Sequence, residues 1–274
     1  MPMSSPGPAV ENQSAVPELP TSTRIKVTES QHFVFFLDEN NLGLATQMDE
    51  IADELEQVYV YVTQRVSASI EGKTEVTFRQ PSTDPCPARG MAEWSPSQTR
   101  ITIYADEGTS REQILGAAAH EVGHLIQFQH FDSGPADPIL LEGWATWAAG
   151  SYWAAWQGIA SFDEGVRSYL QDGRFIPIAD PDLQKLIYGS EGCLEHRDVV
   201  YTEWASFLDY LIDQYGFDAL LSLIAANFPT MPTIEAAVEA TGVSYHEANY
   251  QAVYGRTLQE LEADWLEHLR VGLR

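Results

Sequence analysis

The first half of the chain alternates between short strand-like runs and one long helical stretch. His32–Leu37 reads HFVFFL and predicts a buried strand. Thr74–Arg79 and Arg100–Ala105 alternate apolar and polar residues, which is typical of half-buried strands. Between the first two runs, Gln47–Val66 repeats apolar residues at helical spacing. We therefore expect a small sheet with a crossing helix in this half.

From Ser110 onward the apolar residues recur at the spacing of helices. Ser110 and Gln113 match a capping box, and Gly216 and Gly242 are suitable C-terminal stops. Strands followed by helices indicate an α+β fold. The predicted helices are Arg111–Phe128, Tyr201–Tyr215, Phe217–Asn227, Ile234–Ala240 and Leu258–Leu269.

One stretch has almost the length of a membrane span. Gly143–Phe162 contains twenty residues without a formal charge. It also contains Thr146, Gly150 and Gln157, which make it more polar than a spanning helix usually is. We therefore expect a buried helix here and no membrane span.

Residues 1–24 are predicted to form a disordered tail rich in proline and serine. The first 23 residues hold five prolines, no aromatic residue and no Lys or Arg, so they cannot bury enough apolar area to offset the entropy lost on ordering. They also lack the basic segment and apolar core of a signal peptide.

Composition narrows the classes of partner. The 274 residues are 44% hydrophobic, which is enough for a sizeable core, and carry a formal net charge of -25. This charge repels phosphate backbones and anionic lipid headgroups, so nucleic acid is excluded as an expected partner. High negative charge also suits a secreted or cell-surface protein, and the sequence carries no signal for an oligomeric state.

Cys86 and Cys193 are the two cysteines of the chain. They are too few for a disulfide framework and lack the paired spacing of a zinc ribbon. Two outcomes stay open, namely one disulfide formed outside the cytoplasm or two free thiols.

The strongest chemical signal is the HExxH pattern of His120–His124, which lies inside a predicted helix. Histidines four residues apart share one helix face, so both imidazoles can bind a single zinc ion. Glu121 lies beside them and can take a proton from a metal-activated water. The pattern predicts hydrolytic chemistry; the alternative is two buried histidines satisfied by hydrogen bonds.

Zinc needs a third protein ligand, and two candidates follow the motif. Glu142 comes eighteen positions after His124, on what we expect to be the next helix. His130 has the histidine spacing of the metzincins, but Gln127 stands where that family uses glycine for a sharp turn. We favour Glu142.

The chain resembles the gluzincin metallopeptidases, in which HExxH is followed by a Glu in a segment like Glu142–Thr146. The resemblance implies a thermolysin-like catalytic domain with residues 25–133 as a sheet lobe and residues 134–274 as a helical lobe. The segment Val200–Leu208 is similar to a helix start in gluzincin aminopeptidases, which implies that the Tyr201 hydroxyl stabilises the oxyanion. The alternative for Tyr201 is a core or capping tyrosine, and Tyr152 and Tyr188 are reserve candidates for the oxyanion role. The C-terminal helical pattern is similar to peptidase MA-like domains.

A further element of the resemblance concerns where the substrate is cut. Gly90–Trp94 is a scrambled form of the aminopeptidase segment whose glutamate holds the free amine, which makes Glu93 a candidate anchor. The ordinary alternative is an exposed carboxylate on a strand end. Without the anchor we expect an endopeptidase, with Arg100–Ala105 as an edge strand that pairs with an extended substrate.

Four tryptophans, Trp144, Trp147, Trp153 and Trp156, lie around the Glu142 helix in two i, i+3 pairs. We expect core packing, with an aromatic wall for a substrate or another surface contact as the alternative.

The sequence thus predicts a zinc-dependent peptidase with one zinc ion held by His120, His124 and Glu142, with Glu121 as general base and a peptide or protein as substrate. The alternative from another class is a non-catalytic binding protein that retains the peptidase fold. A zinc site needed only for stability would more often have a fourth protein ligand and would not require Glu121.

Overall fold

The computed structural model describes residues 23–131, 137–179, 183, 187, 193–227 and 247–271. Its strands are β1 (Arg24–Glu29), β2 (Phe33–Asp38), β3 (Thr74–Arg79), β4 (Gly90–Ser95) and β5 (Gln98–Tyr104). Its helices are η1 (Leu42–Gln47), α1 (Met48–Val66), α2 (Arg111–Phe131), α3 (Pro138–Ala149), α4 (Ser151–Gln157), α5 (Phe162–Asp172), α7 (Cys193–Tyr215), α8 (Phe217–Ala226), α10 (Glu247–Tyr254) and α11 (Leu258–Val271).

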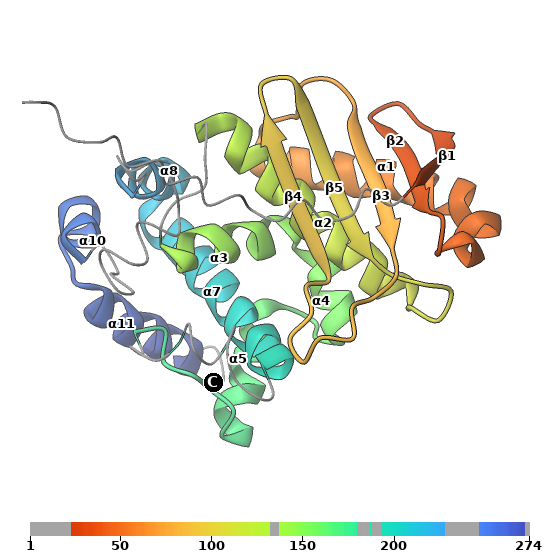
Figure 1. Ribbon diagram of the computed structural model, residues 1–274. Helices are drawn as coiled ribbons and strands as arrows, with labels where there is room; N and C mark the ends of the chain where they lie inside the picture. The colour runs from red at the N-terminus through yellow and green to blue at the C-terminus, as the bar shows by residue number, and fades with distance from the viewer. Residues whose placement is uncertain are drawn as a thin grey trace, which may run out of the picture.

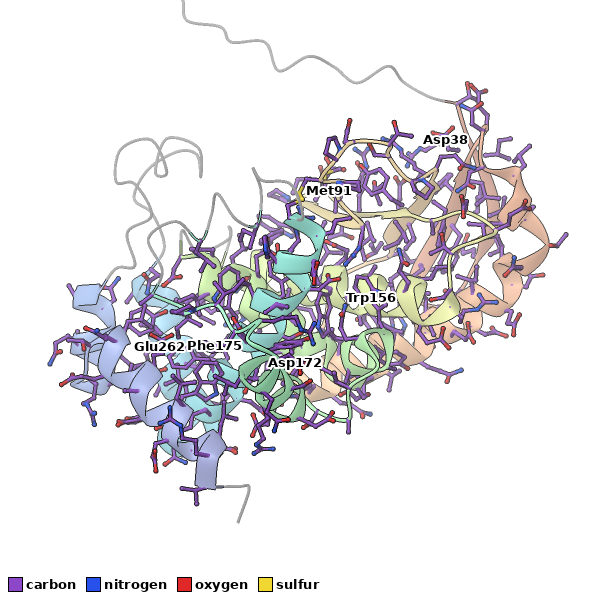
Figure 2. The ribbon with its side chains drawn as sticks, turned by 90° about the horizontal axis from the view of Figure 1, so that it is seen from below. Asp38, Met91, Trp156, Asp172, Phe175 and Glu262 are labelled. Carbon is purple, nitrogen blue, oxygen red and sulfur yellow. A yellow bond between two sulfur atoms is a disulfide. The ribbon has the colours of Figure 1, made fainter. Side chains whose placement is uncertain are left out.

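The described part of the chain is a mixed α+β structure. The five strands lie on one side of the molecule and the later helices on the other, with α3 between them (Figure 1). Seen from below, Asp38 lies at the sheet end and Glu262 among the helices at the opposite end (Figure 2). The separation of strands and helices along the sequence is therefore also a separation in space.

The sheet has the order β1-β2-β3-β5-β4. Strands β2, β3 and β5 run parallel, while β1 and β4 pair antiparallel with their neighbours. The prediction that Arg100–Ala105 forms an edge strand is wrong, because β5 lies between β3 and β4. The edge on this side is β4, whose small residues Gly90 and Ala92 have low strand propensity and gave no strand signal in the sequence.

One face of the sheet forms part of the core. Phe33, Phe35 and Leu37 of β2 are fully buried, and Val76 and Ile103 continue this layer on β3 and β5. Their alternate positions share one face because side chains alternate along a strand. Helix α1 packs against β1 and β2, and α2 packs against β4 and β5. Contact between α1 and α2 completes this half of the molecule.

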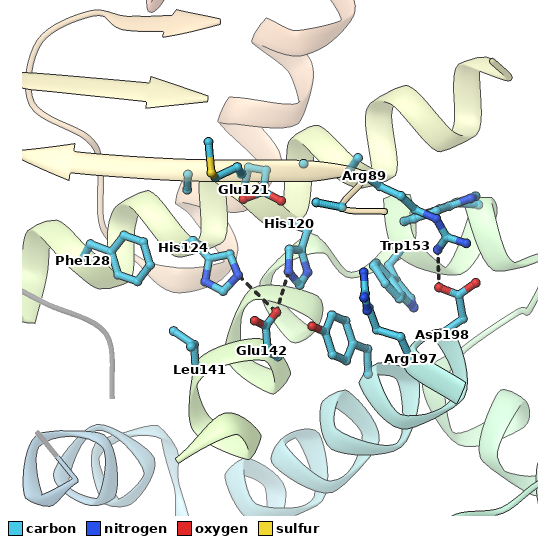
Figure 3. A pocket seen from close by; sticks show the side chains of 17 residues that line it. Arg89, His120, Glu121, His124, Phe128, Leu141, Glu142, Trp153, Arg197 and Asp198 are labelled. Carbon is cyan, nitrogen blue, oxygen red and sulfur yellow. Dashed lines mark hydrogen bonds and ion pairs between the residues drawn. The ribbon is translucent and has the colours of Figure 1, made fainter. Parts of the chain in front are cut away.

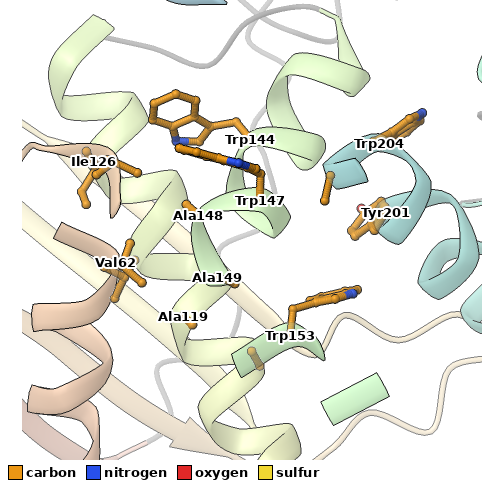
Figure 4. Packing of buried hydrophobic residues seen from close by; sticks show 14 of the residues in the cluster. Val62, Ala119, Ile126, Trp144, Trp147, Ala148, Ala149, Trp153, Tyr201 and Trp204 are labelled. Carbon is orange, nitrogen blue, oxygen red and sulfur yellow. The ribbon is translucent and has the colours of Figure 1, made fainter. Parts of the chain in front are cut away.

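At the centre, α3 packs closely against both α2 and α7. A Cβ on Gly123 would lie 3.0 Å from the Cα of Ala145, so the glycine between the motif histidines lets α3 cross α2 at short range. The Trp144 indole donates a hydrogen bond of 3.1 Å to the Gly123 carbonyl at this crossing. Figure 4 shows the small side chains Ala148 and Ala149 between aliphatic residues, which include Val62 and Ile126, and the larger aromatic residues.

Most predicted elements agree with the structure within a few residues, but several observed elements differ from the prediction. Strands β1 and β4 and helices η1, α5 and α10 were not predicted, and α7 begins at Cys193 rather than Tyr201. Gly143–Phe162 is not one helix, since α3 and α4 are separated at Gly150, which has a φ of 52°. The predicted helix Ile234–Ala240 lies outside the described residues.

No helix in the described ranges combines the length and the hydrophobicity that crossing a bilayer requires. Strand β1 begins at Arg24, the last residue of the predicted tail, and residues 1–22 lie outside the description.

Candidate metal centre and cleft

Helix α2 carries the two histidines and the glutamate of the motif. Its start is capped as predicted, because the Gln113 amide donates a hydrogen bond of 3.2 Å to the Ser110 hydroxyl. His120, Glu121 and His124 are all buried, with 6 to 7% of their surface exposed. Polar side chains are rarely buried without partners. The groups around these three residues therefore indicate which kind of ligand the site can bind.

The carboxylate of Glu142 completes a group of three metal-binding side chains. Glu142 Oε2 lies 3.2 Å from His120 Nε2 and 3.4 Å from His124 Nε2 (Figure 3). The ligand atoms of these three residues all lie within 4.8 Å of one another. In a tetrahedral zinc site with bonds of about 2.1 Å, ligand atoms are about 3.4 Å apart. Two imidazole nitrogens and one carboxylate oxygen at these separations fit a zinc ion.

Neighbouring residues fix the orientation of this group. Thr146 Oγ1 lies 3.2 Å from His120 Nδ1, which leaves Nε2 directed at Glu142. Asp137 caps α3, the helix that carries Glu142, by accepting a hydrogen bond of 2.9 Å from the Ile139 amide. The Tyr250 hydroxyl donates to the other oxygen of Asp137 and so connects α10 to the same cap.

The charges of the three residues depend on one another. Burial alone raises the pKa of Glu142, but the adjacent His124 and His120 lower it more, so its pKa lies below its ordinary value. Burial lowers the pKa of His120 to about 4, against the opposing effect of Glu142. The shifts of Glu142 and His120 favour an ionised carboxylate and a neutral imidazole, the forms that bind a metal ion, whereas the pKa of His124, although burial lowers it, is raised overall by Glu142.

Glu121 lies between the histidines and strand β4. A Cβ on Gly90 would lie 2.3 Å from Glu121 Oε1, so a side chain at position 90 would collide with the carboxylate. Burial, and to a lesser degree the nearby Glu142, raises the pKa of Glu121 to about 8. A carboxyl group whose pKa lies near neutrality suits a group that takes up and returns a proton.

A cavity of about 280 Å³ opens beside these residues. It is lined by residues of β4, α2, α3, α4 and α7. Tyr201 is one of them, and its ring stacks on that of His120 with centroids 5.6 Å apart and planes 3° apart. The predicted oxyanion donor thus lies in the same cavity as the candidate metal ligands.

Two other predicted candidates are not part of this cluster. His130 is exposed at the end of α2 and does not belong to the group of His120, His124 and Glu142. Glu93 is exposed on β4 and is not among the residues that line the cavity. Tyr188, a reserve for the role of Tyr201, lies outside the described residues.

The tryptophans divide between the two expectations. Trp144 and Trp147 are 3 to 4% exposed and pack in the core, with ring centroids 5.6 Å apart. Trp153 and Trp156 line the cavity, so the second pair forms part of its wall.

The structure also answers the question of the cysteines, because Cys86 and Cys193 form a disulfide. It connects the segment before β4 to the start of α7. Arg89, Arg197 and Asp198, which sequence reasoning did not identify, line the cavity close to this bond. The one sequence signal for Arg197 is its position four residues before Tyr201, which places both on one helix face.

No protein-family model matches this chain, and no curated protein matches it either. Among solved structures, it is similar to a mutant of an M1 zinc metallopeptidase from Deinococcus radiodurans, with 16% sequence identity and a TM-score of 0.40. The match covers 86% of this chain and 52% of that protein, so this chain spans about half of its length. A likeness of this size decides neither fold nor activity.

Proposed function

We propose that this protein is a zinc-dependent peptidase. The observation that carries the proposal is the convergence of His120, His124 and Glu142 on one point beside a buried Glu121. His130, the rival third ligand, is outside this group, which supports a gluzincin type of site over a metzincin type.

Each residue of the site has a separate role in this chemistry. His120, His124 and Glu142 would hold the zinc ion, which would act as a Lewis acid on the scissile carbonyl and lower the pKa of water. Glu121 accepts the proton of the attacking water and delivers it to the leaving amine. Tyr201 donates a hydrogen bond to the oxyanion as the carbonyl carbon becomes tetrahedral.

The same proposal includes a thermolysin-like domain of the peptidase MA-like kind, with residues 25–133 as the sheet lobe and residues 134–274 as the helical lobe. Its support is that the HExxH helix packs against the sheet on one side and against α3, the helix of Glu142, on the other. The metal centre then lies where the two lobes meet.

Strand β4 is the part of the sheet that suits an extended peptide. It is an edge strand, and Gly90, Met91 and Ala92 line the cavity beside Glu121. An edge strand offers unpaired backbone groups with which a peptide can form main-chain hydrogen bonds. We assign substrate pairing to β4 rather than to β5, and Glu93 has no role in it as an amine anchor.

We also propose an extracellular or cell-surface location. The disulfide between Cys86 and Cys193 supports it, because disulfides persist in oxidising compartments.

The test combines elemental analysis with peptide cleavage. The proposal predicts one zinc per chain and cleavage of a mixed peptide library that a chelator abolishes and added zinc restores. Zinc or peptide binding without turnover would instead support a non-catalytic binding protein. Mass spectrometry of the products gives the positions of the cleaved bonds.

A further inference from the structure

Three aromatic rings from three helices meet in the wall of the cavity. They belong to the candidate metal ligand His120 of α2, to Trp153 of α4 and to Tyr201 of α7. The ring centroids of His120 and Tyr201 are 5.6 Å apart, those of His120 and Trp153 are 5.5 Å apart, and those of Trp153 and Tyr201 are 6.0 Å apart. Aromatic rings attract one another at such separations. The position of each ring therefore depends on the other two.

The Tyr201 ring lies between two tryptophans, Trp153 and Trp204 (Figure 4). Trp204 follows Tyr201 on the same helix, so its contact moves with Tyr201 and does not fix it against the metal site. Trp153 belongs to α4 instead. Of these two contacts, the one with Trp153 is therefore the one that sets where Tyr201 lies relative to His120.

A hydrogen bond joins Trp153 to the residue that follows Tyr201. The indole Nε1 donates a bond of 3.0 Å to Thr202 Oγ1, and the same hydroxyl donates a bond of 2.8 Å to the Asp198 carbonyl one turn earlier. A hydroxyl can donate one bond and accept another at the same time. Trp153 is 3% exposed and Thr202 is fully buried. Since a buried donor without an acceptor costs free energy, this bond holds α7 in place next to Tyr201.

A second connection runs from Trp153 to the same turn of α7. The Trp156 ring lies 4.8 Å from that of Trp153, and the Arg89 guanidinium lies 4.7 Å from the Trp156 ring centroid. Arg89 in turn forms an ion pair with Asp198. The turn that ends at Thr202 is therefore attached to the tryptophans of α4 at two points, its hydroxyl and its carboxylate.

Helix α4 is itself anchored to the rest of the molecule. It packs against α2, where a Cβ on Gly116 would lie 2.9 Å from Trp156 Cε3, so the glycine lets α4 lie close to the motif helix. At the start of α4, the Ser151 amide donates a hydrogen bond of 2.9 Å to the Tyr61 hydroxyl of α1. Trp153 therefore extends from a helix that is fixed against both α1 and α2.

We propose that Trp153 is a positioning residue that fixes the Tyr201 ring against His120, so that the Tyr201 hydroxyl meets the oxyanion. An oxyanion donor is effective only when it is held in place before the charge develops. A misplacement of about 1 Å can cost about a hundredfold in rate. The inference rests on the proposed peptidase function, in which Tyr201 is the oxyanion donor, and it adds the residue through which that donor is held.

The test is a double-mutant cycle of Trp153→Phe and Tyr201→Phe, assayed on a peptide that the wild type cleaves. Trp153→Phe keeps an aromatic ring but removes the indole N–H. Alone it should lower kcat by about 10- to 100-fold with little change in KM. In the Tyr201→Phe background it should change kcat by less than about twofold, because no hydroxyl remains to be placed. Elemental analysis should find one zinc per chain in every variant.

Two further substitutions separate positioning from general stability. Trp147 is also buried, and its indole also donates to α7, in a bond of 2.7 Å to Asp209, but the described residues that line the cavity do not include it. Trp147→Phe should lower the melting temperature without lowering kcat. Thr202→Val removes the acceptor of the Trp153 bond and should act like Trp153→Phe, whereas Thr202→Ser keeps the hydroxyl and should retain most of kcat.

A measurement that needs no turnover follows the Tyr201 ring directly. In protein with ¹³C-labelled tyrosine rings, the Tyr201 signal is identified by its loss in Tyr201→Phe, and its line shape reports how fast the ring flips. Trp153→Phe and Thr202→Val should accelerate the flips, and Trp147→Phe should leave them unchanged. If the ring responds in this way but the wild type cuts no peptide, the positioning role is supported and the peptidase function is contradicted.

Three results would overturn the inference. The first is a loss of kcat in Trp153→Phe that is equally large with and without the Tyr201 hydroxyl, since this would mean a structural role. The second is a ring-flip rate that stays unchanged in both Trp153→Phe and Thr202→Val. The third is zinc loss in Trp153→Phe that accounts for its loss of turnover, which would mean that Trp153 acts through His120 and not through Tyr201.

Discussion

Glu142 and His130 both follow the motif closely in sequence, yet only Glu142 lies within 3.4 Å of a motif histidine nitrogen. The sequence alone kept both as ligand candidates. What separates them is packing, because Gly123 lets α3 approach α2, whereas His130 remains at the exposed end of α2. The two residues are therefore a matched pair for testing the metal site.

Glu142→Ala should lower zinc occupancy and turnover together, because it leaves two protein ligands where zinc sites have at least three. His130→Ala should leave most of both, since His130 is exposed and outside the ligand group. Elemental analysis of both variants after dialysis measures the occupancy. Metal loss confined to the His130 variant would make His130 the third ligand and overturn the assignment.

Tyr201→Phe tests the oxyanion donor. The ring stacks on His120 and Trp204, with centroids 5.6 Å away in both cases, and phenylalanine keeps these contacts. We expect zinc content and melting temperature to change little, while kcat falls by about a hundred- to thousandfold, or about 3 to 4 kcal/mol. A small loss of rate together with a large loss of stability would mean that the hydroxyl is structural. The same measurement on Tyr152 would then test that reserve candidate.

At this scale the helical spacing of the motif predicts that His120 and His124 lie side by side, as they do, but it does not place Glu142, which comes from another helix. It could not predict the lining by Arg89, Arg197 and Asp198. These residues come from two segments about a hundred positions apart, and only the disulfide and the folded helices bring them together.

Among the elements, α7 connects the cleft to the interior of the helical part. Its Tyr201 faces the metal site, and two residues later Glu203 is fully buried. Glu203 Oε1 accepts a hydrogen bond of 3.1 Å from the Ile176 amide, while Oε2 is buried without a partner among the described residues. Glu262 of α11 accepts a hydrogen bond of 2.7 Å from the Ile178 amide. Two carboxyl groups, one on α7 and one on α11, thus accept hydrogen bonds from the backbone of the segment after α5.

This arrangement predicts a pH-dependent stability. Burial, with a smaller effect of Glu262, raises the pKa of Glu203 well above its ordinary value. A raised carboxyl pKa contributes stability below the unfolded-state pKa of about 4.3, and this contribution is lost as the pH rises towards the folded-state pKa. The wild type should therefore lose stability between pH 5 and pH 8, whereas Glu203→Gln has no carboxyl group to ionise at this position. The free energy of unfolding of the variant minus that of the wild type should increase over this range, by at most about 1.4 kcal/mol per pH unit.

Denaturant unfolding with chelator present in every sample measures this difference without a contribution from metal loss. Glu267→Gln on α11 is the control, because the Glu267 side chain is 67% exposed. A difference between wild type and Glu203→Gln that is the same at both pH values would contradict the account.

Sequence periodicity predicted most helices but not the start of α7. Its first turns include the run Glu195–Asp198, which is polar throughout and has no apolar stripe. Arg197 and Asp198 face the cleft rather than an apolar core, so hydrophobic periodicity carries no signal there. Strand β4 was not predicted for a related reason. Its residues have no strand pattern of their own, and it is a strand because it pairs with β5.

At the scale of the whole molecule, the net charge of -25 contrasts with the arginines at one end of the cleft. The overall field repels anions at long range. Salt screens the long-range field more than a contact inside the cleft. We therefore expect the groups that line the cleft to influence substrate choice more than the net charge does at physiological salt.

The central claim is that Glu121 acts on water at a zinc centre, and Glu121→Gln tests it most directly. Glutamine keeps the shape of the side chain against Gly90 but cannot accept the proton. Zinc content and peptide turnover are measured on the same samples of wild type and variant. The account predicts one zinc per chain in both proteins, with turnover of the variant lower by about a hundred- to ten-thousandfold. Undiminished cleavage by a zinc-loaded Glu121→Gln protein would contradict it.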